Sequence, residues 1–149
     1  MIASLLDVNV LLALFDRDHV QHPSVADWFV ESADQGWATC PVTENGFIRI
    51  LSQPGYTNPT TTADAVARLA SATNDPAHRF WPCDLSLTTA GNVDTSRLLG
   101  PGQVTDAYLL ALAVRHAGRL VTLDRRVTPG MVPGAAPESL LVLGTGLDP

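Results

Sequence analysis

The sequence predicts an α/β fold in which helices cover both faces of a central, mostly parallel sheet of about five strands. Short apolar runs typical of buried strands alternate with segments of helical periodicity along the whole chain. Such alternation is typical of strand–helix units, whose strands lie parallel. A length of 149 residues with 46% hydrophobic content fits one globular domain, residues 1–149.

Each element follows from the pattern of apolar residues. The strands are expected at Ile2–Leu6, Trp37–Cys40, Arg79–Cys83, Leu120–Leu123 and Ser139–Leu143. The helices are expected at Val8–Phe15, Ser24–Ala33, Glu44–Leu51, Thr62–Thr73 and Asp106–Ala117, with a short one near Ser86–Leu99. The segments "SQPGYTNPTTT" and "TPGMVPGAAP" are rich in turn-forming residues and are expected to be loops.

Three residues mark expected helix ends. Thr43 is expected to cap the helix that contains Glu44, and Thr105 the helix that contains Asp106. Gly118 stands where a left-handed residue commonly ends a helix.

The composition excludes several chemistries. All nine basic residues are arginines, so the chain has no lysine for a phosphate-binding loop, a Schiff base or a general base. The net charge of −6 argues against nonspecific attraction to nucleic acid, although acids gathered in a metal site would weaken that argument. Cys40 and Cys83 lack the spacing of a zinc site and are expected to be buried, reduced thiols. The apolar start lacks a basic leader and is interrupted by Asp7, so a cytoplasmic protein without a membrane span is expected.

Four acids from distant segments are expected to meet at one edge of the sheet. Asp7 and Asp124 directly follow apolar strands, while Glu44 and Asp106 lie in the first turns of helices. The carboxyl ends of parallel strands share an edge, where ligands tend to bind. Each acid taken alone could instead cap a turn or complement a helix N-terminus.

Carboxylates that converge repel one another and require protonation, separation or a cation. Oxygen ligands with few nearby histidines or cysteines suit Mg²⁺ or Mn²⁺, which accept phosphate oxygens. Such a metal can activate water for attack on a phosphodiester. The four acids therefore predict a metal site for phosphodiester hydrolysis.

The sequence resembles the PIN-domain ribonucleases, specifically the VapC toxins of bacterial toxin–antitoxin pairs. The resemblance covers nearly the whole chain through "LLDVNVLLALFD", "TENGFIRILSQPGYTNP" and "TDAYLLALAVRHAGRLVTLDRR". It implies that Asp7, Glu44 and Asp106 bind metal and that Asp124 supports a second metal or the attacking water. The polar positions that the resemblance implies as supporting residues are Asn9, Thr105 and Thr122.

The same resemblance implies an α/β/α sandwich, a homodimer, RNA as the substrate and a VapB-type antitoxin as the inhibitor. An antitoxin that inserts a basic side chain into the acidic site would explain the acidic balance of this chain. The sequence does not identify the RNA, because specificity depends on loops and surface shape.

Several other residues have competing interpretations. Tyr56, Arg125 and Arg126 are candidate RNA contacts, although the arginine pair could be merely solvated. Asp84 is expected to cap the following "LSL" segment, and His116 to lie near a helix C-terminus without a catalytic role. The expected core or dimer aromatics are Trp28, Phe29, Phe47, Trp81 and Tyr108.

Two alternative functions follow from the same acids. A Mg²⁺-dependent phosphatase of the haloacid dehalogenase type also has an aspartate after its first strand. That chemistry requires a second acid two residues later, where this chain has "DVN", and generally a lysine, which is absent. A non-catalytic domain that binds RNA or protein would keep the acids for structure alone.

Overall fold

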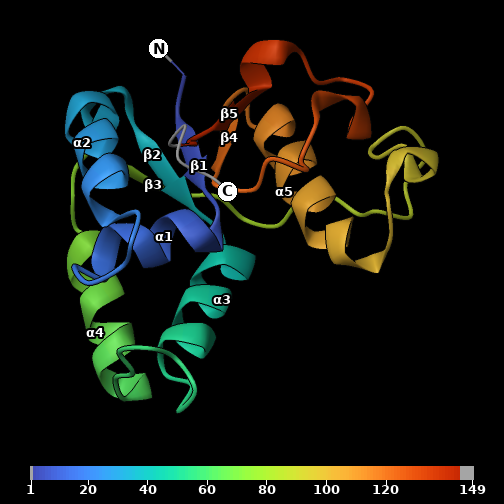
Figure 1. The fold of residues 1–149 in the computed structure, drawn as a ribbon. Helices are drawn as coiled ribbons and strands as arrows, with labels where there is room; N and C mark the ends of the chain where they lie inside the picture. Colours follow the sequence, from blue (N-terminus) through green and yellow to red (C-terminus); the bar gives the residue numbers. More distant parts are fainter. Residues whose placement is uncertain (1, 145–149) are drawn as a thin grey trace.

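One five-stranded sheet runs through the protein, as a computed structural model that describes residues 2–144 shows (Figure 1). Its strands are β1 (Ser4–Leu6), β2 (Trp37–Thr39), β3 (His78–Phe80), β4 (Arg119–Thr122) and β5 (Leu140–Val142). Their order is β3-β2-β1-β4-β5, and every neighbouring pair is parallel. The predicted α/β fold with about five parallel strands is confirmed.

Helices cover both faces of this sheet (Figure 1). They are α1 (Val8–Phe15), α2 (His22–Ser32), α3 (Pro41–Leu51), α4 (Thr62–Ala72) and α5 (Val104–Arg115), with 3-10 turns at Ala33–Gln35, Thr95–Arg97, Pro101–Gln103, Pro129–Met131 and Pro137–Ser139. Successive strand residues point to opposite faces, so Leu5 packs in the core beneath α5, whereas Leu6 packs with α1 to α4. No helix within residues 2–144 is both long and apolar enough to cross a membrane.

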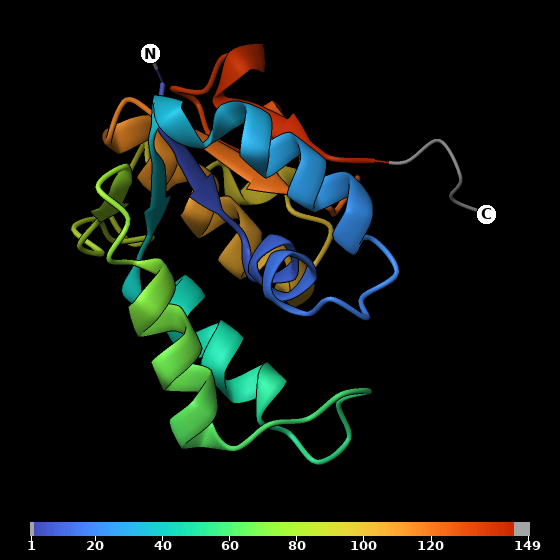
Figure 2. The ribbon, with the colours of Figure 1, turned by 90° about the vertical axis from the view of Figure 1, so that its left-hand side faces the viewer.

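Helices α3 and α4 form an arm that extends beyond the layered body of the molecule (Figure 2). The loop that joins them is tied back to the segment between α1 and α2. The Tyr56 hydroxyl donates to Asp16 at 2.7 Å, and the Asn58 amide donates to Asp18 at 3.0 Å. These two hydrogen bonds fix the turn-rich loop that the sequence predicted.

The helix ends differ from the predicted ones. Thr43 does not precede α3 but lies inside its first turn, where its hydroxyl accepts from the Cys40 N–H at 3.0 Å. Thr105 likewise lies inside α5, which begins at Val104 after a 3-10 turn. Both predicted caps are wrong, because proline and 3-10 backbone geometry start these helices before the threonines.

Gly118 is not the left-handed residue after α5. Ala117 takes that role with φ of 54°. A Cβ at Gly118 would lie 2.5 Å from the Trp81 ring and 2.7 Å from the Ala3 carbonyl oxygen. Close packing against Trp81 and Ala3, rather than backbone conformation, therefore requires glycine there.

The helix predicted near Ser86–Leu99 is reduced to a 3-10 turn, Thr95–Arg97. Polar side chains in this segment bond to the nearby backbone and so compete with helix formation. The Ser86 hydroxyl accepts from the Thr88 N–H, and Asp94 accepts from the Ser96 N–H. Asp84 does not cap the following segment, because its carboxylate pairs with Arg115 and His116 at the end of α5.

The aromatic side chains pack largely as expected. Phe47 and Trp81 are buried, and Trp28, Phe29 and Tyr108 pack against the two cores while partly exposed. Cys40 is buried as predicted, whereas Cys83 is only partly buried, and both are free thiols.

Candidate active site

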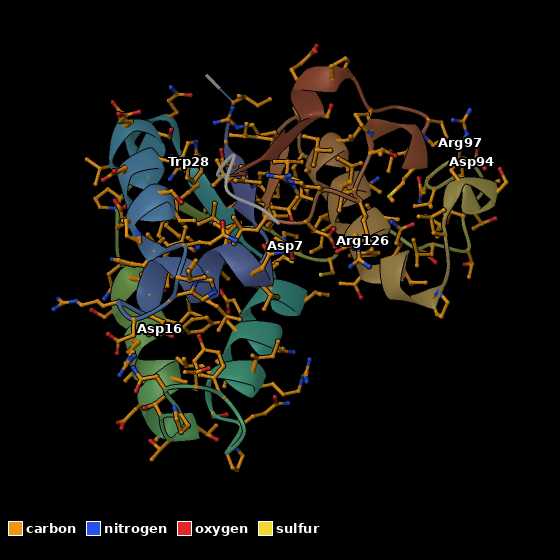
Figure 3. The ribbon with its side chains drawn as sticks, in the orientation of Figure 1. Asp7, Asp16, Trp28, Asp94, Arg97 and Arg126 are labelled. Carbon is orange, nitrogen blue, oxygen red and sulfur yellow. The ribbon has the colours of Figure 1, made fainter. Side chains whose placement is uncertain are left out.

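The sheet has a change of connection at β1, with β2 on one side and β4 on the other. Crevices at such points, beyond the carboxyl ends of the strands, are the usual ligand sites of parallel sheets. Asp7 directly follows β1, and Asp124 lies two residues after β4. Figure 3 shows Asp7 at the start of α1 and Arg126 beside α5, on two sides of this region.

Asp7 is held rigidly. Its side chain accepts from the Val8 N–H and from the Thr122 hydroxyl, each at 2.7 Å. Its own N–H donates to the Val121 carbonyl at 2.9 Å, which joins β1 to β4. Asp7 is only 6% exposed, and this burial raises its pKa despite the two hydrogen bonds that lower it.

Thr122 is the centre of the hydrogen-bond network beneath the site. Its buried hydroxyl donates to Asp7 and accepts from the Asp124 N–H at 3.1 Å and the Asn9 amide at 3.3 Å. Asn9 also accepts from the Leu123 N–H at 3.1 Å. Two predicted supporting residues, Thr122 and Asn9, therefore connect the first strand to the loop that carries Asp124.

Asp106 lies in the first turn of α5 and faces the same region. Burial, followed by the charges of Asp7 and Asp124, raises the pKa of Asp106 to about 6. Three of the four predicted acids are thus close enough for their charges to act on one another. Their repulsion makes the region a place where a cation would bind favourably.

Arg126 is the cation nearest to this group among the described contacts. Its guanidinium donates to both oxygens of Asp124, at 3.1 and 3.0 Å. This forked pair lowers the pKa of Asp124, and the charge of Arg126 also opposes the rise at Asp106. Arg126, a candidate RNA contact, is exposed and forms an ion pair with Asp124 in this structure.

Glu44 lies in the first turn of α3, after β2, and it neither lines the cavity beside Asp7 nor shifts the pKa of Asp7 or Asp106, so the structure does not bring it together with the three aspartates as predicted. Its Oε2 accepts from the Thr39 hydroxyl at 2.6 Å, and the same hydroxyl lies 2.8 Å from Nε2 of His78. The charge of Glu44 raises the pKa of His78, although burial has the larger effect and lowers it. The structure therefore joins Glu44 to Thr39 and His78.

The three aspartates and Glu44 offer only hard oxygen ligands. Within residues 2–144, no three acidic, imidazole or thiol side chains stand closely enough to hold a metal ion without moving. Mg²⁺ does not require such a cage, because it keeps several waters and takes one or two carboxylates together with substrate phosphates. The raised pKa values of Asp7 and Asp106 fit a site that gains stability from a divalent cation.

A cavity of about 400 Å³ opens beside Asp7. It is lined by Asp7, Val8, Val42, Asn45, Gly46, Arg49, Ile50 and Thr105. Gly46 lets α3 approach α1, since a Cβ there would lie 2.7 Å from Val8 Cγ2. Thr105, the third predicted supporting residue, lines this cavity without a described hydrogen bond to the acids.

Arg49 was not selected from the sequence as a site residue. It lies four residues after Asn45, so helical periodicity places both on the face of α3 that lines the cavity. No carboxylate of residues 2–144 forms an ion pair with its guanidinium. It therefore offers an exposed positive charge beside the acids.

The other predicted RNA contacts lie differently. The hydroxyl of Tyr56 is used in the hydrogen bond to Asp16, which together with burial raises the pKa of Tyr56 to about 12. Arg125 directly follows Asp124 and also interacts with another group in the protein. Neither residue lines the cavity beside Asp7.

Comparisons with known proteins identify the family and the fold. The family model described as PIN domain matches residues 4–128. Ribonuclease VapC44 of Mycobacterium tuberculosis (strain CDC 1551 / Oshkosh) is 51% identical over 140 residues, which cover 94% of this chain and 99% of the relative. Ribonuclease VapC39 of the same strain is 44% identical over 122 residues, covering 81% and 88%.

A solved structure shares the fold. The crystal structure of VapBC2 from Rickettsia felis, bound to a DNA fragment from its promoter, aligns with a TM-score of 0.55. The alignment covers 87% of this chain and 96% of that chain at 12% identity. A likeness at this identity supports the arrangement of strands and helices alone.

Proposed function

This chain belongs to the PIN-domain family and to its VapC ribonucleases, and we propose that it is a Mg²⁺- or Mn²⁺-dependent endoribonuclease that acts as a toxin. The observation that carries the metal proposal is the gathering of Asp7, Asp106 and Asp124 at the connection change of the sheet, where Thr122 bridges Asp7 to the Asp124 backbone and the other two carboxylates raise the pKa of Asp106. The family membership sets aside the phosphatase alternative.

Each residue has a distinct part in the proposed reaction. Asp7, Asp106 and Glu44 would hold the cation, which would supply an activated water and stabilise charge on the phosphodiester. Asp124 would orient the attacking water or hold a second cation. Thr122 and Asn9 keep Asp7 and the Asp124 loop in register through their hydrogen bonds.

The partners of this activity belong to the same proposal. The substrate is RNA, and the inhibitor is a small VapB-type antitoxin that places a basic side chain among the acids. The forked ion pair between Arg126 and Asp124 supports this part of the proposal, because it is an example of a guanidinium bound to one of the acids. We further propose that the protein forms a homodimer in the cytoplasm.

Cleavage of RNA by the purified protein tests the catalytic proposal. Activity is expected with Mg²⁺ or Mn²⁺ and is expected to be lost in EDTA. Asp7→Asn and Asp106→Asn are each expected to lower the rate by at least about 100-fold, because each removes a ligand charge. Asp27→Asn, an exposed change on α2, is the matched control.

Two outcomes would contradict this proposal. Full cleavage in EDTA would exclude the metal mechanism. A protein that binds RNA but shows no carboxylate-dependent Mn²⁺ binding would instead be a non-catalytic binding domain. If cleavage is metal-dependent as expected, mapping the cleavage sites on total cellular RNA would identify the sequence that is cut.

A further inference from the structure

The Glu44 carboxylate in the first turn of α3 accepts from a buried threonine hydroxyl on a strand, as the Asp7 carboxylate does from Thr122. Thr39, the last residue of β2, is fully buried and lies 2.6 Å from Oε2 of Glu44. The same Thr39 oxygen lies 2.8 Å from Nε2 of His78 on β3. The three side chains therefore form a short hydrogen-bonded series from β3 through β2 to the first turn of α3.

The direction of these hydrogen bonds follows from counting protons. A carboxylate that binds metal is ionised and can only accept, so the single hydroxyl proton of Thr39 is donated to Glu44. The Thr39 oxygen then accepts from His78, whose Nε2 must carry a proton. The series runs from His78 through Thr39 to Glu44, and Oε1 of Glu44 can serve as a ligand.

His78, the donor at the start of this series, is held in place by its contact with Trp37. The His78 ring packs edge-on against Trp37 with ring centroids 4.6 Å apart. Trp37 is 2% exposed, and its indole N–H donates to Asp75 at 2.9 Å. The parallel register also pairs Trp37 with His78, so the sheet sets the distance between the two rings.

We propose that Thr39 and His78 are positioning residues that hold the Glu44 carboxylate in the orientation it needs to bind the metal. A glutamate side chain has several rotatable bonds, and a ligand that is already ordered loses less freedom when the cation binds. This inference rests on the proposed function, because it requires Glu44 to be a ligand.

Calorimetric titration of the purified protein with Mn²⁺, in the absence of RNA, tests the proposal. Thr39→Val removes the hydroxyl while keeping the shape, and is expected to weaken Mn²⁺ binding by about 10-fold. Thr39→Ser restores a hydroxyl and is expected to return most of the affinity. His78→Phe is expected to weaken binding, and His78→Gln, which retains an N–H donor, to recover part of it.

Kinetics separates positioning from general damage to the fold. At limiting Mn²⁺, kcat of Thr39→Val and His78→Phe is expected to fall while KM for RNA stays near the wild-type value. Excess Mn²⁺ is expected to restore kcat, which it would not do for a misfolded protein. Melting temperatures of all variants in EDTA verify that each is folded.

Glu44→Gln distinguishes the possible failures. If Glu44→Gln binds Mn²⁺ weakly while Thr39→Val and His78→Phe bind like the wild type, the positioning role is overturned and the metal site stands. If Glu44→Gln itself binds Mn²⁺ like the wild type, Glu44 is not a ligand, and that part of the proposed function fails together with this inference.

Discussion

Asp106 shows how strongly single residues in the site are affected by their surroundings. Burial and two carboxylates raise its pKa from an ordinary 3.8 to about 6. The folded state therefore binds the Asp106 proton more tightly than the unfolded chain does. Ionised Asp106 destabilises the metal-free fold fully above about pH 6, and this effect disappears below pH 3.8.

Asp106→Asn is expected to remove that penalty. In EDTA at pH 7.5 the variant should be more stable than the wild type by about 1 kcal/mol, or about 2–4 °C in melting temperature. The difference should shrink as the pH falls through 6 and vanish near pH 4. The variant should also gain less stability from Mn²⁺. A difference that stays constant with pH would place its cause outside the Asp106 charge.

Thr122 is expected to matter for both stability and the site. Thr122→Val removes the hydroxyl that Asp7 and the Asp124 N–H share, and should lower the free energy of unfolding by about 1–3 kcal/mol. The loss should grow with pH, because ionised Asp7 needs the donor most. Urea unfolding at pH 5 and pH 8 measures it, with Thr122→Ser as the control that should behave like the wild type.

Arg49 is expected to contact the RNA backbone, given the proposed substrate. It lines the cavity beside Asp7 and forms no ion pair with a carboxylate of residues 2–144. Arg49→Gln should weaken RNA binding and reduce the slope of log affinity against log salt by about 0.7–1. Fluorescence anisotropy in EDTA measures this without cleavage.

Arg68→Gln, on α4, is the control for Arg49 because Arg68 lines a different cavity with Asp16 and Asp18. An unchanged salt slope in Arg49→Gln would exclude a phosphate contact. If the variant instead lost affinity only for the antitoxin, Arg49 would belong to the inhibitor interface.

At the scale of elements, the junctions between helices and strands bring the site together. Asp7 directly follows β1 and is also the N-cap of α1. The same residue therefore connects a strand to a helix and lines the cavity. A short connection, residues 116–118, joins α5 to β4, which pairs with β1. Gly118 allows this connection to pack closely, because a Cβ there would overlap Trp81 and Ala3.

Gly118→Ala is expected to destabilise the protein by about 1–3 kcal/mol, because the new Cβ would overlap the Trp81 ring and the Ala3 carbonyl. Gly102→Ala, where a Cβ meets nothing within 4 Å, is the control and should have little effect. Thermal melting in EDTA compares the two. Equal melting temperatures would show that Trp81 and Ala3 can move aside without cost.

At the scale of the whole molecule, the proposed toxin activity should appear as a growth phenotype. Expression of the chain alone should slow bacterial growth through RNA cleavage. We predict a small VapB-type antitoxin encoded beside this chain, and its co-expression should restore growth. Asp106→Asn is the inactive control, and equal growth with wild type and Asp106→Asn at matched protein levels would contradict a toxin role.

The sequence by itself determined the fold class and the approximate position of every strand. Apolar runs such as those before Asp7 and Asp124 define buried parallel strands, and parallel topology places their carboxyl ends at one edge. This local pattern was enough to select the four acids as candidate metal ligands. It could not select Arg49 or His78, whose roles depend on contacts with distant segments.

Only the tertiary structure decided which side chains face one another. It brought Asp7 and Asp124 close enough to Asp106 for their charges to raise its pKa, and it paired Arg126 with Asp124. It also linked Glu44 to Thr39, and Thr39 to His78, which lies 39 positions further along the sequence. The structure also showed that the left-handed residue after α5 is Ala117, whereas the sequence had predicted Gly118. Periodicity describes which face of an element is buried, whereas hydrogen bonds and close packing depend on the exact approach of elements that the local sequence does not encode.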